Sequence, residues 1–200
     1  VDRQFFEQAA AIIVDEVNRL EKRVRAFSDL AAEPPVHFTD FDMNEVMEER
    51  IAFLRSAHPE VLYNLRLAPK APLARADEDL VRGVLTNLLE NAAEAAGAGG
   101  VVLGITAVQD GVLRMEVHDS GPGLSLHARE TLFEPTISFK KTGMGLGLSI
   151  ARKSALLSGG DIECIAGELG GAAFRLTLRP AASSLVHLSE TETEWAQSES

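Results

Sequence analysis

The 200-residue chain has little of what marks secreted, membrane-spanning or nucleic-acid-binding proteins. Cys164 is its only cysteine, so no disulfide can form within the chain, and a reducing compartment such as the cytoplasm is expected. No apolar run is long enough to cross a bilayer, and the N-terminus lacks a signal-peptide pattern. Basic residues are also scarce. The 19 lysines and arginines against 30 aspartates and glutamates give a net charge of −11, which disfavours a nucleic acid as partner.

The N-terminal segment carries an apolar stripe with heptad spacing. Apolar residues recur at alternating steps of four and three, at Phe6, Ala10, Ile13, Val17, Leu20, Val24, Phe27 and Ala31. This pattern is typical of a helix in a bundle or coiled coil, and one such helix cannot bury its own stripe. We expect a partner helix from a second copy or from an upstream segment; the alternative is docking on the following domain. Because the chain starts at Val1 already in helical rhythm, we expect it to be part of a longer protein.

Pro34 and Pro35 end this helix and mark a predicted domain boundary. Beyond them, the patterns predict strands at 36–41, 61–67, 101–108, 112–118, 161–166 and 172–178, and helices at 42–57, 77–96 and 148–157. The 42–57 helix is expected to bury Val46, Ile51, Phe53 and Leu54, and residues 68–74 read as a proline-punctuated loop. Residues 181–200 are polar and acidic, which predicts a disordered tail.

Two glycine clusters give the strongest local signal in the chain. Asp119 opens the first, DSGPG, after an expected strand, and the second, GMGLG at 143–147, opens an expected helix. A carboxylate held by a glycine turn can accept hydrogen bonds from the amino group of a ligand. Glycines before a helix let backbone N–H groups approach a phosphate at the positive end of the helix dipole. Either cluster alone is more simply a turn, but together they indicate a nucleotide site, near which Lys140 and Lys141 could bind phosphate.

The helix expected at 77–96 carries Asn87 and Asn91, one turn apart on the same side. Asparagine is a mediocre helix former, so this pair needs a reason. Either the amides bond to the backbone, or an amide oxygen binds Mg²⁺, which takes few protein oxygens and keeps water and phosphate as its other ligands. The nearby Glu90 and Glu94 are expected to be solvated charges.

Four motifs in order resemble the ATP-binding domain shared by sensor histidine kinases, type II topoisomerases, heat-shock chaperones and mismatch-repair ATPases. They are NLLENAAEA at 87–95, DSGPG at 119–123, LFEP at 132–135 and TGMGLGLSIARK at 142–153, and GGAAFRLTL at 170–178 resembles the closing strand. LFEP and GMGLGLSI point to the histidine kinases. EVNRLEKRVRAFSDLAAEPP at 16–35 resembles the second helix of their dimerisation and phosphotransfer hairpin, especially in nitrogen-regulation sensors.

The resemblance implies an α+β fold in three parts. Residues 1–33 would be the second hairpin helix, of coiled-coil type. Residues 36–180 would be the catalytic domain, a two-layer α/β sandwich in which helices cover a mixed sheet, and 181–200 the tail. The chain's irregular order of strands and helices is compatible with this fold.

The resemblance also implies ATP or ADP with Mg²⁺ as ligands. It assigns Asn91 to Mg²⁺, Asn87 to the phosphate end, and Asp119 to the adenine amino group. The stretch from Leu124 to Thr142 matches a mobile lid. The other implied nucleotide-binding residues are Gly121, Gly123, Phe133, Lys140, Lys141, Thr142, Gly143, Gly145, Leu146, Gly147 and Leu148.

The histidine that accepts phosphate in such kinases has no counterpart on the N-terminal helix. The five histidines are His37, His58, His118, His127 and His187, and His118 is expected to be a structural or surface residue. The resemblance therefore implies transfer of the γ-phosphoryl group to a histidine upstream of this chain and then to an aspartate of a response regulator receiver domain. It also implies a homodimer formed through the N-terminal helix, and no residue of this chain is assigned a catalytic role.

Three other functions were weighed. An ATPase of the chaperone or mismatch-repair kind has a glutamate general base where this chain has Asn87, which argues against water activation. An anti-sigma serine kinase does not begin with a heptad helix. A degenerate nucleotide-binding scaffold is opposed by the intact Asn91, Asp119 and glycines. The motifs of P-loop, dinucleotide-binding and protein-kinase folds are absent from the sequence.

Overall fold

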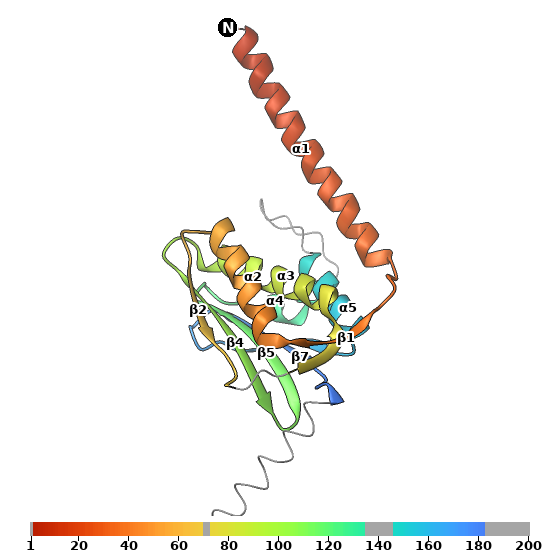
Figure 1. The fold of residues 1–200 in the computed structure, drawn as a ribbon. Helices are drawn as coiled ribbons and strands as arrows, with labels where there is room; N and C mark the ends of the chain where they lie inside the picture. Colours follow the sequence, from red (N-terminus) through yellow and green to blue (C-terminus); the bar gives the residue numbers. More distant parts are fainter. Residues whose placement is uncertain (1, 70–72, 135–145, 183–200) are drawn as a thin grey trace, which may run out of the picture.

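In the computed structural model, residues 2–69, 73–134 and 146–182 are described (Figure 1). The helices are α1 (Asp2–Ala31), α2 (Met43–Ala57), α3 (Glu78–Ala96), α4 (Leu126–Glu130) and α5 (Gly147–Leu157). The strands are β1 (Phe38–Asp42), β2 (Leu62–Arg66), β3 (Leu73–Asp77), β4 (Val101–Gln109), β5 (Val112–Asp119), β6 (Asp161–Ala166) and β7 (Ala172–Leu178). The predicted disordered tail lies outside the described residues from 183 onward.

A five-stranded mixed sheet forms one layer of the domain. Its strand order is β2-β4-β5-β7-β6, with β2 parallel to β4 and the other pairs antiparallel. Helices α2, α3 and α5 lie together on one face of this sheet (Figure 1). The predicted α+β fold, a mixed sheet covered by helices, is therefore confirmed, because the long apolar faces of the helices and one face of the sheet can be buried only against each other.

The turn between β4 and β5 follows from two residues. Asp110 and Gly111 both have positive φ, at 52° and 70°, which is the combination that a type I′ hairpin turn requires. Because this turn matches the twist of the flanking strands, β5 pairs along β4 from Val112 to Asp119. The hairpin predicted from the sequence is confirmed, and its far end delivers Asp119 to the edge of the sheet where the glycine cluster begins.

Strand β3 is a correction to the sequence prediction. Residues 68–74 were expected to form a loop, but the strand begins at Leu73, pairs antiparallel with β1, and forms a separate two-stranded sheet. The backbone of Pro180, after the last strand, bridges to Ala74. The strand therefore exists because distant segments supply its partners, and the local sequence carries no such signal.

Helix α2 begins and ends as predicted but buries a different set of side chains. Its N-cap, Asp42, accepts a hydrogen bond of 2.7 Å from the amide of Asn44. The fully buried residues include Met43 and Met47, whereas Phe53 is 51% exposed. The prediction that Phe53 packs in the core is wrong, because its ring lies instead 5.6 Å from the guanidinium of Arg50 at the surface.

Helix α1 projects away from the rest of the molecule, with its last turn nearest α5 (Figure 1). The large apolar side chains of its stripe are more than half exposed: Phe6, Ile13, Val17, Leu20, Val24 and Phe27. Just after the helix, the carbonyl of Ala32 accepts a hydrogen bond from Lys153 of α5. The stripe is thus not covered by the following domain, contrary to the docking alternative. Among the described segments, no helix has both the length and the apolar character needed to cross a membrane.

Candidate nucleotide site

Asp119 lies at the end of β5 with its carboxylate held by backbone amides. It is 3% exposed. Its Oδ1 accepts hydrogen bonds from the amide of Gly121 at 2.8 Å and from the amide of Ala172 at 3.2 Å. Its backbone carbonyl accepts a third bond, of 3.1 Å, from the amide of Gly171. Within the described residues Oδ2 accepts no hydrogen bond, so it is the oxygen available to a donor on a ligand.

Two glycines let the backbone come this close to the carboxylate. A Cβ atom at Gly121 would lie 2.6 Å from the carbonyl oxygen of Ala95, at the end of α3. A Cβ at Gly171 would overlap both Oδ1 and the carbonyl oxygen of Asp119. Gly123 continues the same turn with a φ of 73°. The predicted glycines 121 and 123 are therefore beside Asp119, and Gly171 joins them from the start of β7.

Burial sets the electrostatics of this carboxylate. Loss of solvation raises the pKa of Asp119, and the amide hydrogen bonds from Gly121 and Ala172 offset part of that rise. An ionised carboxylate in such surroundings is stabilised by any further donor it can reach, because unpaired charge is costly away from water. The site is therefore suited to a neutral N–H donor, such as the exocyclic amino group of a purine.

Asn87 and Asn91 lie one turn apart on α3, as predicted. Asn87 is half-buried, and its Nδ2 donates a 3.2 Å hydrogen bond to the carbonyl of Gly83. Its Oδ1 faces the first residue of α5, since a Cβ at Gly147 would lie 3.0 Å from that oxygen. Asn91 is exposed, and its side chain makes no hydrogen bond to any described residue. Glu90 and Glu94 are also exposed, as expected.

The first turn of α5 borders the same end of α3. Leu146 is the N-cap residue, and no side chain caps this end in the described part of the chain. The amide hydrogens of the following turn therefore remain open to an anion, which a helix N-terminus favours. Gly147 and Leu148, both predicted site residues, begin this turn. The predicted residues Lys140, Lys141, Thr142, Gly143 and Gly145 lie outside the described residues.

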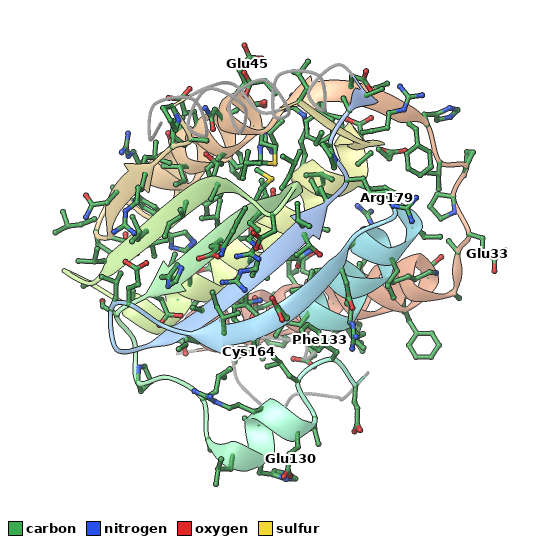
Figure 2. The ribbon with its side chains drawn as sticks, turned by 90° about the horizontal axis from the view of Figure 1, so that it is seen from below. Glu33, Glu45, Glu130, Phe133, Cys164 and Arg179 are labelled. Atoms are coloured by element: carbon green, nitrogen blue, oxygen red, sulfur yellow. The ribbon has the colours of Figure 1, made fainter. Side chains whose placement is uncertain are left out.

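A short helix and an aromatic residue precede that undescribed stretch. Helix α4 was not predicted; Ser125 caps it by accepting a hydrogen bond from the amide of Ala128. It projects away from the sheet, with Glu130 at its end (Figure 2). Phe133 lies back against the domain, its ring 4.8 Å from the guanidinium carbon of Arg152. Arg152 in turn bonds both carboxylate oxygens of Asp161, at 2.9 and 3.2 Å, so Phe133 packs on a fixed cation of α5.

Sequence reasoning missed three residues of this arrangement. Gly171 and Ala172 donate their amides to Asp119, and Arg152 positions Phe133. From the sequence, the glycine pair at 170–171 indicates only a turn before the closing strand. A signal was available, because paired glycines directly before a strand indicate a close backbone approach.

The comparisons with known proteins agree with this geometry. Residues 76–182 match the family model of histidine kinase-, DNA gyrase B- and HSP90-like ATPases. This match covers more than half of the chain and includes the asparagine helix, Asp119 and both glycine clusters. The chain belongs to this family.

Relatives of this ATPase domain are sensor histidine kinases. The chain is 35% identical over 187 residues to the nitrogen regulation protein NtrY of Azorhizobium caulinodans, with 89% of this chain and 24% of NtrY covered. It is 32% identical over 176 residues to the histidine kinase/phosphatase NtrB of Rhizobium leguminosarum bv. phaseoli, with 76% of this chain and 44% of NtrB covered. The chain thus spans about a quarter to under half the length of these relatives.

Solved structures give the same assignment. The catalytic domain of histidine kinase ThkA matches with a TM-score of 0.66 at 29% identity, covering 72% of this chain and 95% of that domain. The full-length histidine kinase ShkA, solved with AMPPNP, matches with a TM-score of 0.70 at 27% identity, covering 84% of this chain and 36% of ShkA. The described domain is therefore an ATP-binding catalytic domain of the histidine-kinase type.

Proposed function

We propose that this chain binds ATP through Asp119 and the start of α5 and supplies the catalytic module of a two-component sensor histidine kinase. The γ-phosphoryl group would pass to a histidine outside this chain and then to an aspartate of a response regulator. The observation that carries this proposal is the buried carboxylate of Asp119, fixed through Oδ1 by two amides and leaving Oδ2 for the adenine amino group. A carboxylate in this position accepts hydrogen bonds and so selects a base that donates.

The phosphate end of the site follows from α3 and α5. The uncapped amides at the start of α5 would bind phosphate oxygens, and the Oδ1 of Asn87 borders them. Asn91, exposed one turn further along α3, offers an amide oxygen to Mg²⁺. The described residues contain no cluster of three or more histidine, cysteine, aspartate or glutamate side chains that could hold a metal. The amide oxygen of Asn91 fits Mg²⁺, which is bound through one or two protein oxygens together with substrate phosphates.

Mg²⁺, when bound, supplies positive charge against the phosphate groups. This chain's own residues act by position: Asp119 fixes the base, the α5 amides orient the phosphates, and Phe133 on Arg152 ties the stretch that matches a lid to α5. No described group needs to serve as an acid or base for this role. Phosphoryl transfer depends mostly on positioning and charge stabilisation, so the module fits the chemistry.

Helix α1 would form one half of the dimerisation and phosphotransfer hairpin, with residues 36–180 as the catalytic domain. Its exposed apolar stripe requires a partner, and a second copy of the chain supplies one of matching pattern. ThkA has been solved in complex with the response regulator TrrA, and that structure matches with a TM-score of 0.70 at 27% identity, covering 84% of this chain. We therefore propose two partners for this protein: a response regulator receiver domain, and a second copy of the chain that dimerises through α1.

Hydrolysis of ATP by the chaperone or mismatch-repair mechanism is less consistent with the site. That mechanism needs a general base one turn before the metal ligand, and this position holds Asn87. An amide cannot take a proton from water, and the Nδ2 of Asn87 already donates to the carbonyl of Gly83. Transfer to a protein side chain positioned by another element avoids this requirement.

The test is calorimetric titration of ADP, with and without Mg²⁺, into the wild-type chain and into Asp119→Ala and Asn91→Ala. We expect the wild type to bind, Asp119→Ala to lose at least about tenfold in affinity, as loss of a hydrogen bond to a charged group implies, and Asn91→Ala to lose the dependence on Mg²⁺. The matched control is Asn64→Ala, an exposed asparagine on β2, which should bind as the wild type does. If the folded wild-type chain, checked by circular dichroism, binds no nucleotide, the degenerate-scaffold reading replaces this proposal.

A further inference from the structure

His118 is a buried histidine immediately before Asp119, on the face of the sheet opposite the helices. Its side chain is 1% exposed. The neighbouring Val117 belongs to the core beneath the helices, and side chains alternate along a strand, so His118 points to the other face. Of the two expectations for His118, a structural or a surface residue, burial excludes the second. Complete burial of an imidazole requires that both ring nitrogens have partners.

The two partners of this imidazole fix its protonation pattern. Nδ1 accepts a 3.2 Å hydrogen bond from the amide of Glu168, and Nε2 lies 3.0 Å from Oε2 of Glu116. Burial raises the pKa of Glu116, but the hydrogen bonds from Arg175 and His118, together with charge interactions with these two side chains, lower it overall, so this carboxylate is ionised and can only accept. A backbone amide can only donate. Nδ1 therefore accepts the amide hydrogen of Glu168, and Nε2 is the nitrogen that donates to Glu116.

The backbone amide that donates to His118, that of Glu168, belongs to the turn that holds Asp119. The turn at residues 167–171 joins β6 to β7, and its last residue, Gly171, donates to the carbonyl of Asp119. The next amide, that of Ala172, donates to Oδ1 of the same residue. His118 thus holds the turn near its start, and the amides at and just after its end hold Asp119. The neighbouring residues His118 and Asp119 are therefore both hydrogen-bonded to the same segment, and these bonds together set the position of the carboxylate.

A second contact on the same turn is weaker. The side chain of Glu168 forms a pair with Arg66 of β2, with both N–O distances at 3.0 Å. Both side chains are about half exposed, and exposed ion pairs contribute little because water and salt screen them. The bond to the buried imidazole is shielded from water, so of these two contacts it is the one that holds the turn more firmly.

We propose that His118 is a positioning residue for adenine recognition: its Nδ1 holds the 167–171 turn, and the turn aims the carboxylate of Asp119 at the amino group of the base. This inference rests on the proposed role of Asp119. His118 does not touch the nucleotide, so its effect appears only in the contact that Asp119 makes. Ligand contacts elsewhere, including those at the start of α5, are independent of it.

Two substitutions distinguish the hydrogen bond made by Nδ1 from the one made by Nε2. In His118→Asn, Oδ1 is as many bonds from Cβ as Nδ1, so the acceptor for the Glu168 amide is kept and the donor to Glu116 is lost. In His118→Gln, the amide group lies one bond further out, so a donor to Glu116 is kept and the acceptor is lost. Both replace a buried ring by a smaller amide, and their costs in packing are comparable. Glu163→Gln, an exposed site on the same face, is the surface control.

The experiment measures affinities for two nucleotides by calorimetry, in the wild type, the three variants and Asp119→Asn. The probes are ADP and purine riboside 5′-diphosphate, which lacks the exocyclic amino group. We expect His118→Gln to bind ADP about tenfold more weakly, the loss of about one hydrogen bond, and to bind the purine analogue as the wild type does. His118→Asn and Glu163→Gln should keep the wild-type ratio of the two affinities. Thermal melts confirm that each variant is folded at the temperature of titration.

The outcomes distinguish this inference from the proposed function. If Asp119→Asn weakens ADP binding and His118→Gln does not, the adenine contact stands and the role of His118 is wrong. If His118→Gln weakens both nucleotides equally, or His118→Asn fails to restore the ratio, the residue is merely structural and the inference is overturned. If Asp119→Asn binds ADP as tightly as the wild type, the proposed adenine contact itself fails.

Discussion

Replacing Gly171 by alanine tests the geometry of the site at its tightest point. A Cβ at this position would overlap Oδ1 and the carbonyl oxygen of Asp119 and would lie 2.7 Å from the amide nitrogen of Gly121. Two of these three atoms belong to the backbone, so a side-chain rotation cannot relieve the contact. The methyl group must push the start of β7 away from the glycine turn at residues 119–123.

The cost can be estimated from the contacts that this movement breaks. Inserting a methyl group into a tightly packed site costs about 1–3 kcal/mol. The displaced strand would also weaken the bonds from the amides of Gly171 and Ala172 to Asp119, each worth about 1 kcal/mol. We expect a loss of roughly 3 kcal/mol in the free energy of unfolding. At about 2–4 °C for each kcal/mol, the melting temperature should fall by about 6–12 °C.

The assay pairs a thermal melt with calorimetric titration of Mg²⁺-ADP. Gly171→Ala should show the lowered melting temperature and, below it, at least a tenfold loss of affinity, since the bond from the Ala172 amide to Oδ1 is weakened and the carboxylate is displaced. The control is Gly170→Ala, where φ is 88° and a Cβ would meet no atom within 4 Å. That variant carries only backbone strain, of about 1–2 kcal/mol, and should keep its affinity. Wild-type affinity in Gly171→Ala would refute the argument that close approach of β7 holds the carboxylate.

Two further predictions concern the charge of Asp119 and the stripe of α1. Because burial raises the pKa of Asp119, stability that its neutral form provides at low pH is lost as the pH rises through that pKa. Asp119→Asn should therefore melt at a higher temperature than the wild type near neutral pH, and a difference that fails to shrink under acid would contradict this. The exposed stripe predicts that the chain is a dimer, which light scattering would detect. Val17→Glu should dissociate this dimer, and the off-stripe control Asn18→Glu should not. A monomeric wild type at micromolar concentration would contradict the prediction.

Elements with strong local signals could be predicted closely from the sequence. Strands β6 and β7 begin and end where the apolar alternation and the flanking glycines indicated. Helix α3 begins after Asp77, whose side chain accepts a 3.1 Å hydrogen bond from the amide of Leu80, and ends at Gly97 with positive φ. Caps and turns act within a few residues, so the sequence nearby is enough to locate them.

Elements that depend on distant partners could not be predicted in this way. The five residues of β3 come soon after Pro69 and Pro72 in the sequence. They form a strand because β1 lies alongside and the amide of Arg75 donates to the carbonyl of Arg179. Phe53 fits the apolar rhythm of α2, but its ring is half exposed and lies against Arg50. Met47 lies so close to Gly104 of β4 that a Cβ there would be 2.9 Å from its sulfur, so the buried face of the helix is centred on the methionines.

In the candidate site, too, the residues in local motifs could be predicted, whereas the contacts from distant segments could not. Asn87, Asn91 and the cluster beginning at Asp119 could be recognised because each motif is contiguous. Of the two amides that fix the Asp119 carboxylate, that of Gly121 belongs to the same motif, whereas that of Ala172 comes some fifty positions later and reaches it because β7 pairs with β5. A motif therefore identifies the group that meets the ligand, whereas its orientation and its pKa are properties of the sheet. Variation at Gly171 or His118 should consequently alter nucleotide recognition while the motifs that carry Asn91, Asp119 and the start of α5 remain intact.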